Sequence, residues 1–291
     1  MPAAPDDPFL LDPRQVRRSF DAAADHFDAN AAVHAEIRSR LLERLDVVRM
    51  DPDVVVDLGA GTGHTSRALK DRYKTAQVIA LDIAPRMLAQ AAKQQRLLRR
   101  FATVAMDAHR LALRAGSVDM VFSNLMLQWS HDPDAVLKEV RRVLKPNGLV
   151  TFTTLGPDTL RELRAAWATI DTYTHVHRFI DMHDLGDALL RAGFAEPVMD
   201  TERLTITYRN LDAMLHELTG SGSSNMAHGR RHGLTARGAM HRLRESYEPL
   251  RRDGALPVSL EVVYGHAWVG QERASRGGEV RVPIANLRRR S

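Results

Sequence analysis

Short apolar strands alternate with helical stretches between residues 54 and 154, and this alternation constrains the fold more than any other feature of the chain. Most of these strands are apolar throughout, and they are expected at residues 54–56, 77–81, 103–106, 118–123 and 149–154. Strands that are apolar on both faces are typical of a parallel sheet covered by helices on both sides. The pattern therefore predicts a doubly wound α/β domain.

Helical periodicity precedes, connects and follows these strands. We expect two helices within residues 13–47, then helices ending near 73 and spanning 85–96, 132–144, 157–169 and 181–192, with a stop and turn at 145–148. Two later strands, near 198–208 and at 258–268, enclose a helical, Arg-rich insertion. The predicted organisation is an N-terminal helical lid (1–49), a core (50–209 and 253–270), a substrate or partner insertion (210–252) and a flexible basic tail (271–291).

The net charge of +5 is unevenly distributed along the chain. Residues 221–252 hold seven Arg and two Glu, a net of +5, and residues 271–291 hold six Arg and two Glu, a net of +4. The rest of the chain therefore carries a net charge of −4. A basic segment on a mildly acidic body indicates either an acidic partner or a solvated helix face. We expect no nucleic acid, because Tyr247 is the one Phe, Tyr or Trp in 221–252 on which a base could stack.

Several classes of protein are excluded by what the sequence lacks. The 291 residues contain no cysteine, which rules out disulfides, thiolate zinc sites, iron–sulfur clusters and cysteine nucleophiles. No apolar run approaches the ~20 residues that span a bilayer, and residues 1–8 lack the features of a signal peptide. We therefore expect a cytoplasmic protein without membrane contact.

A glycine-rich loop follows the first strand, at residues 57–63 (DLGAGTG). Its glycines allow a tight turn and a close approach of backbone N–H groups to a ligand. Asp82 ends the second strand and Asp107 the third, so that with Asp57 three carboxylates share the edge where such sheets bind ligands. There Asp82 can accept hydrogen bonds from ribose hydroxyls, and Asp107 from an adenine amino group. The alternative is that the three carboxylates only cap helices.

A dinucleotide-binding loop is the nearest rival, but it has Gly or Ala where His64 stands. The loop and its preceding aspartate resemble instead motif I of class I S-adenosylmethionine (SAM) methyltransferases, over about residues 50–155. The resemblance implies a Rossmann-like, seven-stranded, mostly parallel sheet that binds SAM and releases S-adenosylhomocysteine. The cofactor-binding residues that we expect are Asp57, Gly59, Ala60, Gly61, Gly63, Asp82, Ile83, Met87, Asp107, Ala108, Asn124 and Gln128.

Segments outside this core resemble the malonyl-[acyl-carrier protein] O-methyltransferases, the BioC family of biotin synthesis. The similar segments span about residues 14–268 and are 20–28 (FDAAADHFD), 123–129 (SNLMLQW), 154–160 (TLGPDTL), 175–179 (HVHRF), 220–225 (GSGSSN), 233–235 (GLT) and 264–268 (YGHAW). The family usually has Tyr at the position of Phe27 and Gln at that of His34. These two departures concern the shape of the lid and leave the glycine-rich loop intact.

The finer resemblance implies methylation of the free carboxylate of a malonyl thioester on acyl carrier protein, early in biotin synthesis. A carboxylate is ionised at neutral pH, so its attack on a sulfonium methyl needs no general base, only positioning and removal of water. The expected partner of the Arg-rich insertion is then the acidic carrier protein, and we expect a monomer. Two alternatives stay open: a SAM-binding assembly or modification factor of the same fold, and a small-molecule methyltransferase.

For the substrate, we expect Arg178 to anchor the malonyl carboxylate and His175 to donate a hydrogen bond nearby. The alternative for His175, His177 and His183 is an ordinary surface or packing role. A zinc site made of these histidines has no clearly placed fourth ligand, so we expect no metal.

Aromatic residues near the strand ends carry the remaining expectations. Gln128 and Trp129 are expected to line the mouth of the cofactor site, with a core position as the alternative for Trp129. Tyr264, His266 and Trp268 alternate along a strand and therefore share one face, where we expect them to pack in the interior.

Overall fold

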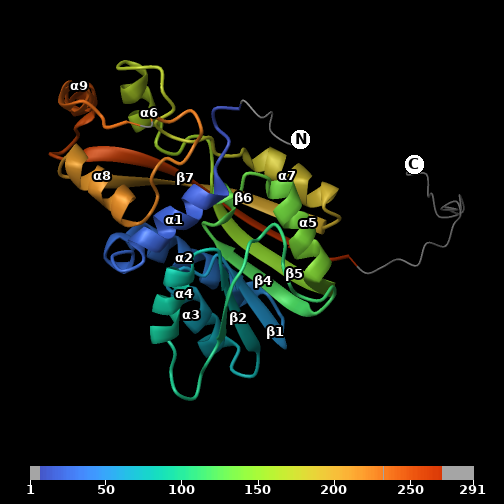
Figure 1. Ribbon diagram of the computed structural model, residues 1–291. Coiled ribbons are helices and arrows are strands. Elements are labelled where there is room, and N and C mark those ends of the chain that lie inside the picture. The colour runs from blue at the N-terminus through green and yellow to red at the C-terminus, as the bar shows by residue number, and fades with distance from the viewer. Residues whose placement is uncertain (1–6, 232, 271–291) are drawn as a thin grey trace, which may run out of the picture.

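A seven-stranded sheet forms the centre of the computed structural model, which describes residues 7–231 and 233–270 (Figure 1). The strand order is β3-β2-β1-β4-β5-β7-β6, and neighbouring strands are parallel except at β7, which is antiparallel to both β5 and β6. The predicted mostly parallel α/β fold is confirmed. The strands are β1 (Val54–Leu58), β2 (Gln77–Asp82), β3 (Ala102–Ala105), β4 (Val118–Asn124), β5 (Leu144–Leu155), β6 (Ala195–Tyr208) and β7 (Leu256–Trp268).

Helices cover both faces of this sheet. In the described residues they are α1 (Pro13–Ala23), α2 (Ala32–Arg44), α3 (His64–Arg72), α4 (Pro85–Lys93), α5 (Pro133–Val143), α6 (Arg161–Ala168), α7 (Met182–Arg191), α8 (Leu211–Gly220) and α9 (Arg237–Tyr247). Successive residues of a strand point to opposite faces. Val55 accordingly packs in one cluster with Leu41 of α2, whereas Val56 packs in another with Leu137 of α5 and Leu189 of α7. The two faces of the sheet thus hold two separate cores.

A third core lies where β6 ends and β7 begins, beyond the carboxyl ends of the parallel strands; we call this the hairpin end. There α6, α8 and α9 gather around the hairpin, at the upper left of Figure 1. The buried side chains of this core include Trp167 of α6, Met214 of α8, Tyr247 of α9 and Val258 of β7. The Tyr247 hydroxyl donates a hydrogen bond of 2.9 Å to the Pro257 carbonyl oxygen, which ties α9 to β7.

Two predicted boundaries are wrong by four or more residues, whereas the bounds of the insertion at 210–252 agree with the structure. Strand β5 begins at Leu144 and runs through the turn expected at 145–148, because the chain bulges there instead of reversing: Asn147 has φ of 62°, and the register against β4 shifts. Helix α6 begins four residues later than expected, after Leu160 with φ of 56°. The insertion is helical in α8 and α9, whereas 221–231 and 233–236 form turns and loops. The expected tail at 271–291 lies outside the described residues.

The face of β7 shared by Tyr264, His266 and Trp268 packs toward the α2 side of the sheet. Tyr264 is buried and Trp268 packs partly buried against the same core, while His266 is half-buried. The expected interior position is therefore confirmed in full for Tyr264. Within the described residues, none of the helices is long and apolar enough to cross a membrane.

Gly265 of β7 provides a test of this packing. A Cβ atom there would meet the Phe152 ring and would lie 2.9 Å from the Met199 sulfur, in the middle of the sheet. We expect Gly265→Ala to lower the free energy of unfolding by about 1–3 kcal/mol, measured by urea denaturation. The matched control is Gly238→Ala on exposed α9, where added helix propensity gives up to about 1 kcal/mol of stabilisation. Equal effects of the two substitutions would contradict this account.

Candidate active site

The glycine-rich loop connects β1 to α3 in a conformation that favours glycine. Gly59, Gly61 and Gly63 have φ of 79°, 53° and 83°. A Cβ atom on Gly59 would lie 2.5 Å from the Met126 side chain, and one on Gly63 would lie 2.8 Å from the Ala91 Cα atom. A Cβ atom on Gly61 would meet nothing within 4 Å. The loop is therefore closely packed at both ends and open at its centre, which leaves room for a ligand against its backbone.

Asp82 joins this loop to the next one along the sheet edge. Its Oδ2 accepts a hydrogen bond of 2.8 Å from the Gly61 N–H, and its Oδ1 accepts one of 2.8 Å from the Ala84 N–H. Burial raises the pKa of Asp82, and these backbone donors oppose the shift. Each carboxylate oxygen keeps a lone pair for a further donor, as a pair of ribose hydroxyls would require.

Asp57 lies beneath the loop, where its side chain is buried. Ser66 Oγ donates a hydrogen bond of 2.5 Å to Oδ2, while Oδ1 has no partner within the described part of the chain. Burial, with a smaller contribution from the Asp82 charge, raises the pKa of Asp57 to about 7. A buried carboxylate oxygen without a partner is suited to a cationic group, and the ammonium of a SAM molecule is such a group.

Asp107 follows the end of β3, and its side chain is hydrogen-bonded to His109. His109 donates its backbone N–H to Asp107 Oδ1 at 2.9 Å, and its Nδ1 lies 2.7 Å from the same oxygen. The ring of His109 stacks on that of His131 at 4.2 Å between centroids. The hydrogen bonds from His109 lower the pKa of Asp107 against the opposing effect of burial. Asp107 is thus held as a carboxylate with Oδ2 left for an amino group.

A cavity of about 110 Å³ lies between this sheet edge and the N-terminal helices. Eight of the twelve expected cofactor residues line it: Gly59, Gly61, Asp82, Ile83, Met87, Asp107, Ala108 and Asn124. Asp57, Ala60 and Gly63 lie outside its wall, and Gln128 lines a different cavity. The opposite wall includes Val16 and Phe20 of α1 and His34 of α2. The residues present fit SAM: a glycine cradle and two carboxylates line the cavity, and the carboxylate of Asp57 lies buried beneath the loop.

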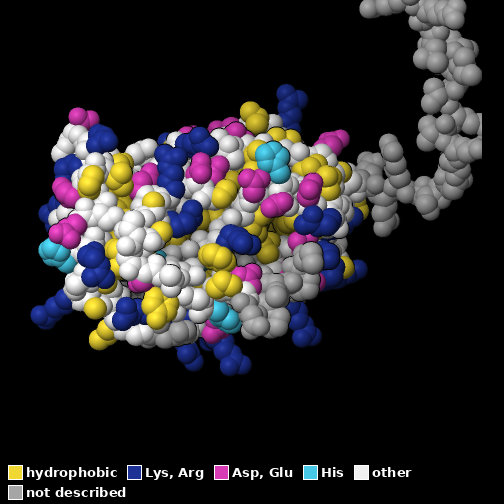
Figure 2. All heavy atoms as spheres, turned by 90° about the horizontal axis from the view of Figure 1, so that it is seen from above, with side chains coloured by type: hydrophobic (Ala, Val, Ile, Leu, Met, Phe, Trp, Pro, Cys, Tyr) yellow, Lys and Arg dark blue, Asp and Glu magenta, His cyan; other side chains and the backbone are white. Residues whose placement is uncertain are grey.

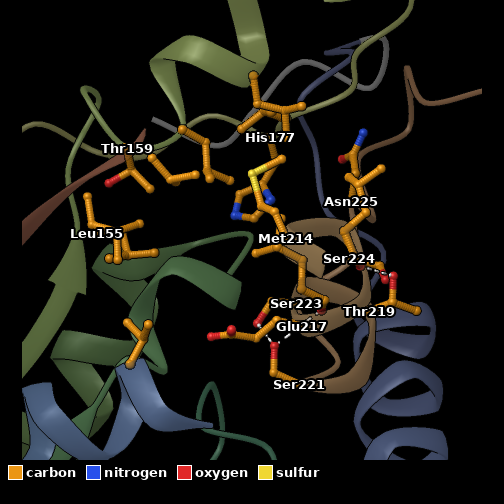
Figure 3. A pocket seen from close by; sticks show the side chains of 18 of the residues that line it. Leu155, Thr159, His177, Met214, Glu217, Thr219, Ser221, Ser223, Ser224 and Asn225 are labelled. Atoms are coloured by element: carbon orange, nitrogen blue, oxygen red, sulfur yellow. Dashed lines mark hydrogen bonds between the residues drawn. The ribbon is translucent and has the colours of Figure 1, made fainter. Parts of the chain in front are cut away.

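A second cavity, of about 240 Å³, lies between the sheet edge and the helices of the hairpin end (Figure 3). Its walls are largely apolar, with Leu155, Met214 and Leu260 among them. Polar side chains gather on one side, and those labelled in Figure 3 are Glu217, Thr219, Ser221, Ser223, Ser224 and Asn225.

The two cavities share part of their walls. His34, Leu125 and Trp129 line both, so a group bound in either cavity lies against the same three residues. Asn124 fixes one of these wall residues, because its Nδ2 donates a hydrogen bond of 3.3 Å to the His34 carbonyl oxygen. The arrangement is that of a transfer enzyme, in which a donor and an acceptor meet at a common wall.

Comparison with known proteins agrees with this geometry. The family model "Methyltransferase domain" matches residues 56–152. The chain is 48% identical to malonyl-[acyl-carrier protein] O-methyltransferase of Methylovorus sp. (strain MP688), over 92% of this chain and 93% of that protein. It is 49% identical to the protein of the same name from Laribacter hongkongensis (strain HLHK9), with the same two coverages. The chain belongs to the malonyl-[acyl-carrier protein] O-methyltransferase family.

Solved structures agree with the fold. The chain resembles YcgJ of Bacillus subtilis with a TM-score of 0.58 over 80% of this chain and 99% of that one, at 15% identity. It also resembles a SAM-dependent methyltransferase of Thermotoga maritima with a TM-score of 0.52 over 87% and 99% of the two chains, at 17% identity. At such identities the likeness concerns the fold alone. Substrate recognition in this member of the family must be derived from its own cavity.

The two residues predicted to act on the substrate lie in different places. His175 lines the second cavity, but its Nε2 is bonded to Asp171 Oδ1 at 2.7 Å and its ring stacks on Trp167 at 3.6 Å. Arg178 is exposed and lines neither cavity; its guanidinium lies 5.0 Å from the ring centroid of Phe9. Arg178 therefore lies outside both cavities, and its role as the anchor of the carboxylate stays a prediction.

Two histidines that were not among the predicted site residues also line the cavities. His177 lines the second cavity, and His34 lines both. The sequence held a signal for each: His177 stands in the family segment 175–179, and His34 replaces the usual glutamine. His183 lies apart at the start of α7, where it is exposed and bonded to Asp181, so the three histidines do not converge. Within the described residues, no group of three or more His, Asp or Glu is arranged to hold a metal.

The raised pKa of Asp57 predicts a pH dependence of cofactor binding. Below pH 7 the carboxyl group of Asp57 holds a proton, and the negative charge that attracts the ammonium of SAM from beneath the loop is lost. The affinity for SAM should therefore fall as the pH drops from about 8 to 6, by at most about tenfold per pH unit. Calorimetry across this range should show the fall in the natural chain, whereas Asp57→Asn should bind weakly with no such dependence.

Ser66→Ala is the matched control for this experiment. Because the Ser66 hydroxyl lowers the pKa of Asp57, its removal should move the fall in affinity to higher pH. A pH dependence that survives unchanged in Asp57→Asn would assign the titration to another group.

Proposed function

We propose that the chain transfers a methyl group from SAM to the free carboxylate of a malonyl thioester carried by acyl carrier protein, early in biotin synthesis. The single observation that carries this proposal is the wall shared by the two cavities, formed by His34, Leu125 and Trp129. The names of relatives at 48% and 49% identity support the choice of substrate. When bound, SAM supplies a sulfonium methyl group; the carboxylate oxygen forms the new bond to it, and the electron pair of the broken bond stays on sulfur.

The residues at the shared wall suit a reaction without proton transfer. A malonyl carboxylate is ionised at neutral pH and already carries the electron pair that attacks. Burial, with a smaller effect of the Arg38 charge, lowers the pKa of His34 to about 4, so its imidazole is neutral there. His34 therefore acts in positioning, and no base is required of it.

The second cavity also holds no ammonium or guanidinium group among the described residues of its lining. An ion pair with both carboxylate oxygens would stabilise the carboxylate before it reacts and weaken its attack. Catalysis requires tighter binding of the transition state than of the ground state. Hydroxyl, amide and imidazole donors leave the carboxylate reactive, and the carboxylate of Glu217 on the polar side of the cavity offers it no cation. The apolar walls exclude water from it, and desolvation strengthens a charged nucleophile.

The test of the proposal is direct methyl transfer. Purified protein incubated with SAM and malonyl-carrier protein should yield a carrier one methyl group heavier by mass spectrometry, and the gain should disappear without SAM. Acetyl-carrier protein, which lacks the free carboxylate, is the matched substrate control and should gain no methyl group. Absence of transfer beside a known active methyltransferase would refute the proposal.

A second measurement separates catalysis from a purely structural role in SAM binding. The chain should restore growth without biotin to a strain that lacks its own malonyl-carrier methyltransferase. An assembly factor of the same fold would bind SAM and fail to restore growth.

We propose that the acidic carrier docks on the Arg-rich insertion. Several of the Arg residues there are already paired within the protein. Arg244 is paired with Asp212 at 2.8 Å and Arg251 with Glu248 at 2.5 Å. Arg230 donates hydrogen bonds to Gln15 Oε1 at 2.8 Å and to a backbone carbonyl, so it holds the N-terminal segment against the insertion. Figure 2 shows the same mixture at the surface, where Lys and Arg are interspersed with Asp and Glu.

Arg237 and Arg242 of α9 are the exposed basic residues best suited to docking. Neither makes a hydrogen bond or ion pair within 7–231 and 233–270. Reversal of both to Glu should raise KM for malonyl-carrier protein about 5- to 10-fold, and the effect should shrink as salt rises. Malonyl-pantetheine, which has no carrier to dock, should keep its KM.

The matched control for this charge reversal is Arg114→Glu. Arg114 is also exposed, but it lies in the turn before β4, at the edge of the sheet opposite the cavities. An equal loss with both substrates, or an equal effect of Arg114→Glu, would show that α9 is not the docking surface.

A further inference from the structure

Two histidines of the second cavity have a buried ring nitrogen without a partner in the part of the chain that the structure describes: His34 at Nδ1, on the wall shared with the first cavity, and His177 at Nε2. His177 is 5% exposed, and its Nε2 atom is shielded from solvent without a hydrogen bond. Figure 3 shows its imidazole inside the cavity, beside the Met214 side chain. A buried polar nitrogen without a partner is unfavourable in the free protein, which indicates that a ligand completes the hydrogen bond.

His175, two residues earlier, provides the contrast. It lines the same cavity, but its Nε2 is already bonded to Asp171 Oδ1 at 2.7 Å. Its ring is held flat against Trp167, with 3.6 Å between the ring centroids. Of the two histidines, His177 is the one whose Nε2 is buried without a partner in the described residues.

The imidazole of His177 is neutral at physiological pH. Burial, with a smaller effect of the Arg164 charge, lowers the pKa of His177 to about 4. The guanidinium of Arg164 is itself turned to the backbone, with hydrogen bonds of 3.0 and 3.1 Å to the carbonyl oxygens of Pro157 and Thr159. A neutral imidazole has one N–H and is a donor without a charge.

The position of His177 indicates which atom of the substrate lies within its reach. Its ring centroid lies 4.9 Å from that of Trp129, which belongs to the wall shared by both cavities. In a malonyl thioester one methylene group separates the carboxylate from the thioester carbonyl. A carboxylate at the shared wall would leave the carbonyl one group further into the second cavity, which His177 lines next to that wall.

We infer that His177 binds the substrate directly, by donating a hydrogen bond from Nε2 to the thioester carbonyl oxygen of the malonyl group. This inference rests on the proposed function and assigns a specificity-determining contact within it. The contact fixes the far end of the three-carbon unit, so that the carboxylate is held at the shared wall without a charged residue gripping it. It also favours a thioester over an acid of the same length that lacks the carbonyl.

The test compares two ligands on the full chain loaded with S-adenosylhomocysteine, so that no turnover occurs. One is malonyl-pantetheine, and the other is its carboxyethyl thioether, in which a methylene group replaces the thioester carbonyl. The natural chain should bind the thioester about 3- to 10-fold more tightly, the range of one neutral hydrogen bond. His177→Phe should abolish this preference by weakening the thioester alone, and His177→Gln, which keeps a donor, should restore part of it.

His175→Phe is the matched control, because it makes the same change of side chain in the same cavity at an already bonded histidine. It should keep the preference for the thioester. If His177→Phe weakens both ligands equally or neither, or if His175→Phe removes the preference, the inference is overturned. Should the phenylalanine variant not fold, the ¹⁵N shift of His177 Nε2 in the natural chain decides: it should move with the thioester and stay in place with the thioether.

These outcomes are distinct from a failure of the proposed function. If the natural chain neither binds malonyl-pantetheine nor methylates malonyl-carrier protein, the proposed function fails. If it methylates the carrier but binds thioester and thioether alike, the inference about His177 fails alone.

Discussion

The site depends on one carboxylate that bonds to two loops at once. Asp82 accepts the N–H groups of Gly61 and Ala84, and it thereby fixes the glycine-rich loop relative to the turn after β2. The bonds exist because parallel strands end at the same edge, where β1 and β2 lie side by side. A carboxylate that satisfies backbone donors on two loops keeps both in place before any ligand arrives. The positive φ angles of the loop glycines depend on the same constraint.

Under the proposed function, the substrate lies beside neutral histidines and hydroxyl groups, with Glu217 as the one carboxylate among the described residues of the second cavity, whereas three aspartates serve the cofactor. The carboxylates of Asp57, Asp82 and Asp107 lie at or beneath the first cavity, and the imidazoles of His34 and His177 line the second. This division follows from the chemistry: a cofactor with an ammonium, a ribose and an adenine offers many donors to carboxylates. A nucleophile that must stay reactive is better served by weak contacts and dry walls.

The sequence predicted the fold and the cofactor edge well, because both depend on local patterns. Apolar strands identified the parallel sheet, and Asp82 and Asp107 at strand ends indicated the edge. The bulge of β5 escaped prediction, since the residues before Gly148 read equally well as a turn. The sequence also did not show that His177, and not the predicted Arg178, faces the second cavity, and the cause is similar. Both stand in an extended segment between α6 and α7 whose course is fixed by packing against Trp129 and Phe9, and sequence alone does not tell which neighbour points inward.

The long β6–β7 hairpin separates the two halves of the site in a way that bears on how such enzymes diversify. The cofactor cavity lies at the ends of β1, β2 and β3, while α6 and α8 at the hairpin end supply part of the second cavity and belong to a core of their own. Substitutions in that outer core can reshape the acceptor pocket and leave the SAM-binding edge untouched. The hairpin therefore allows the pocket for the methyl acceptor to change in evolution while the SAM-binding edge stays the same.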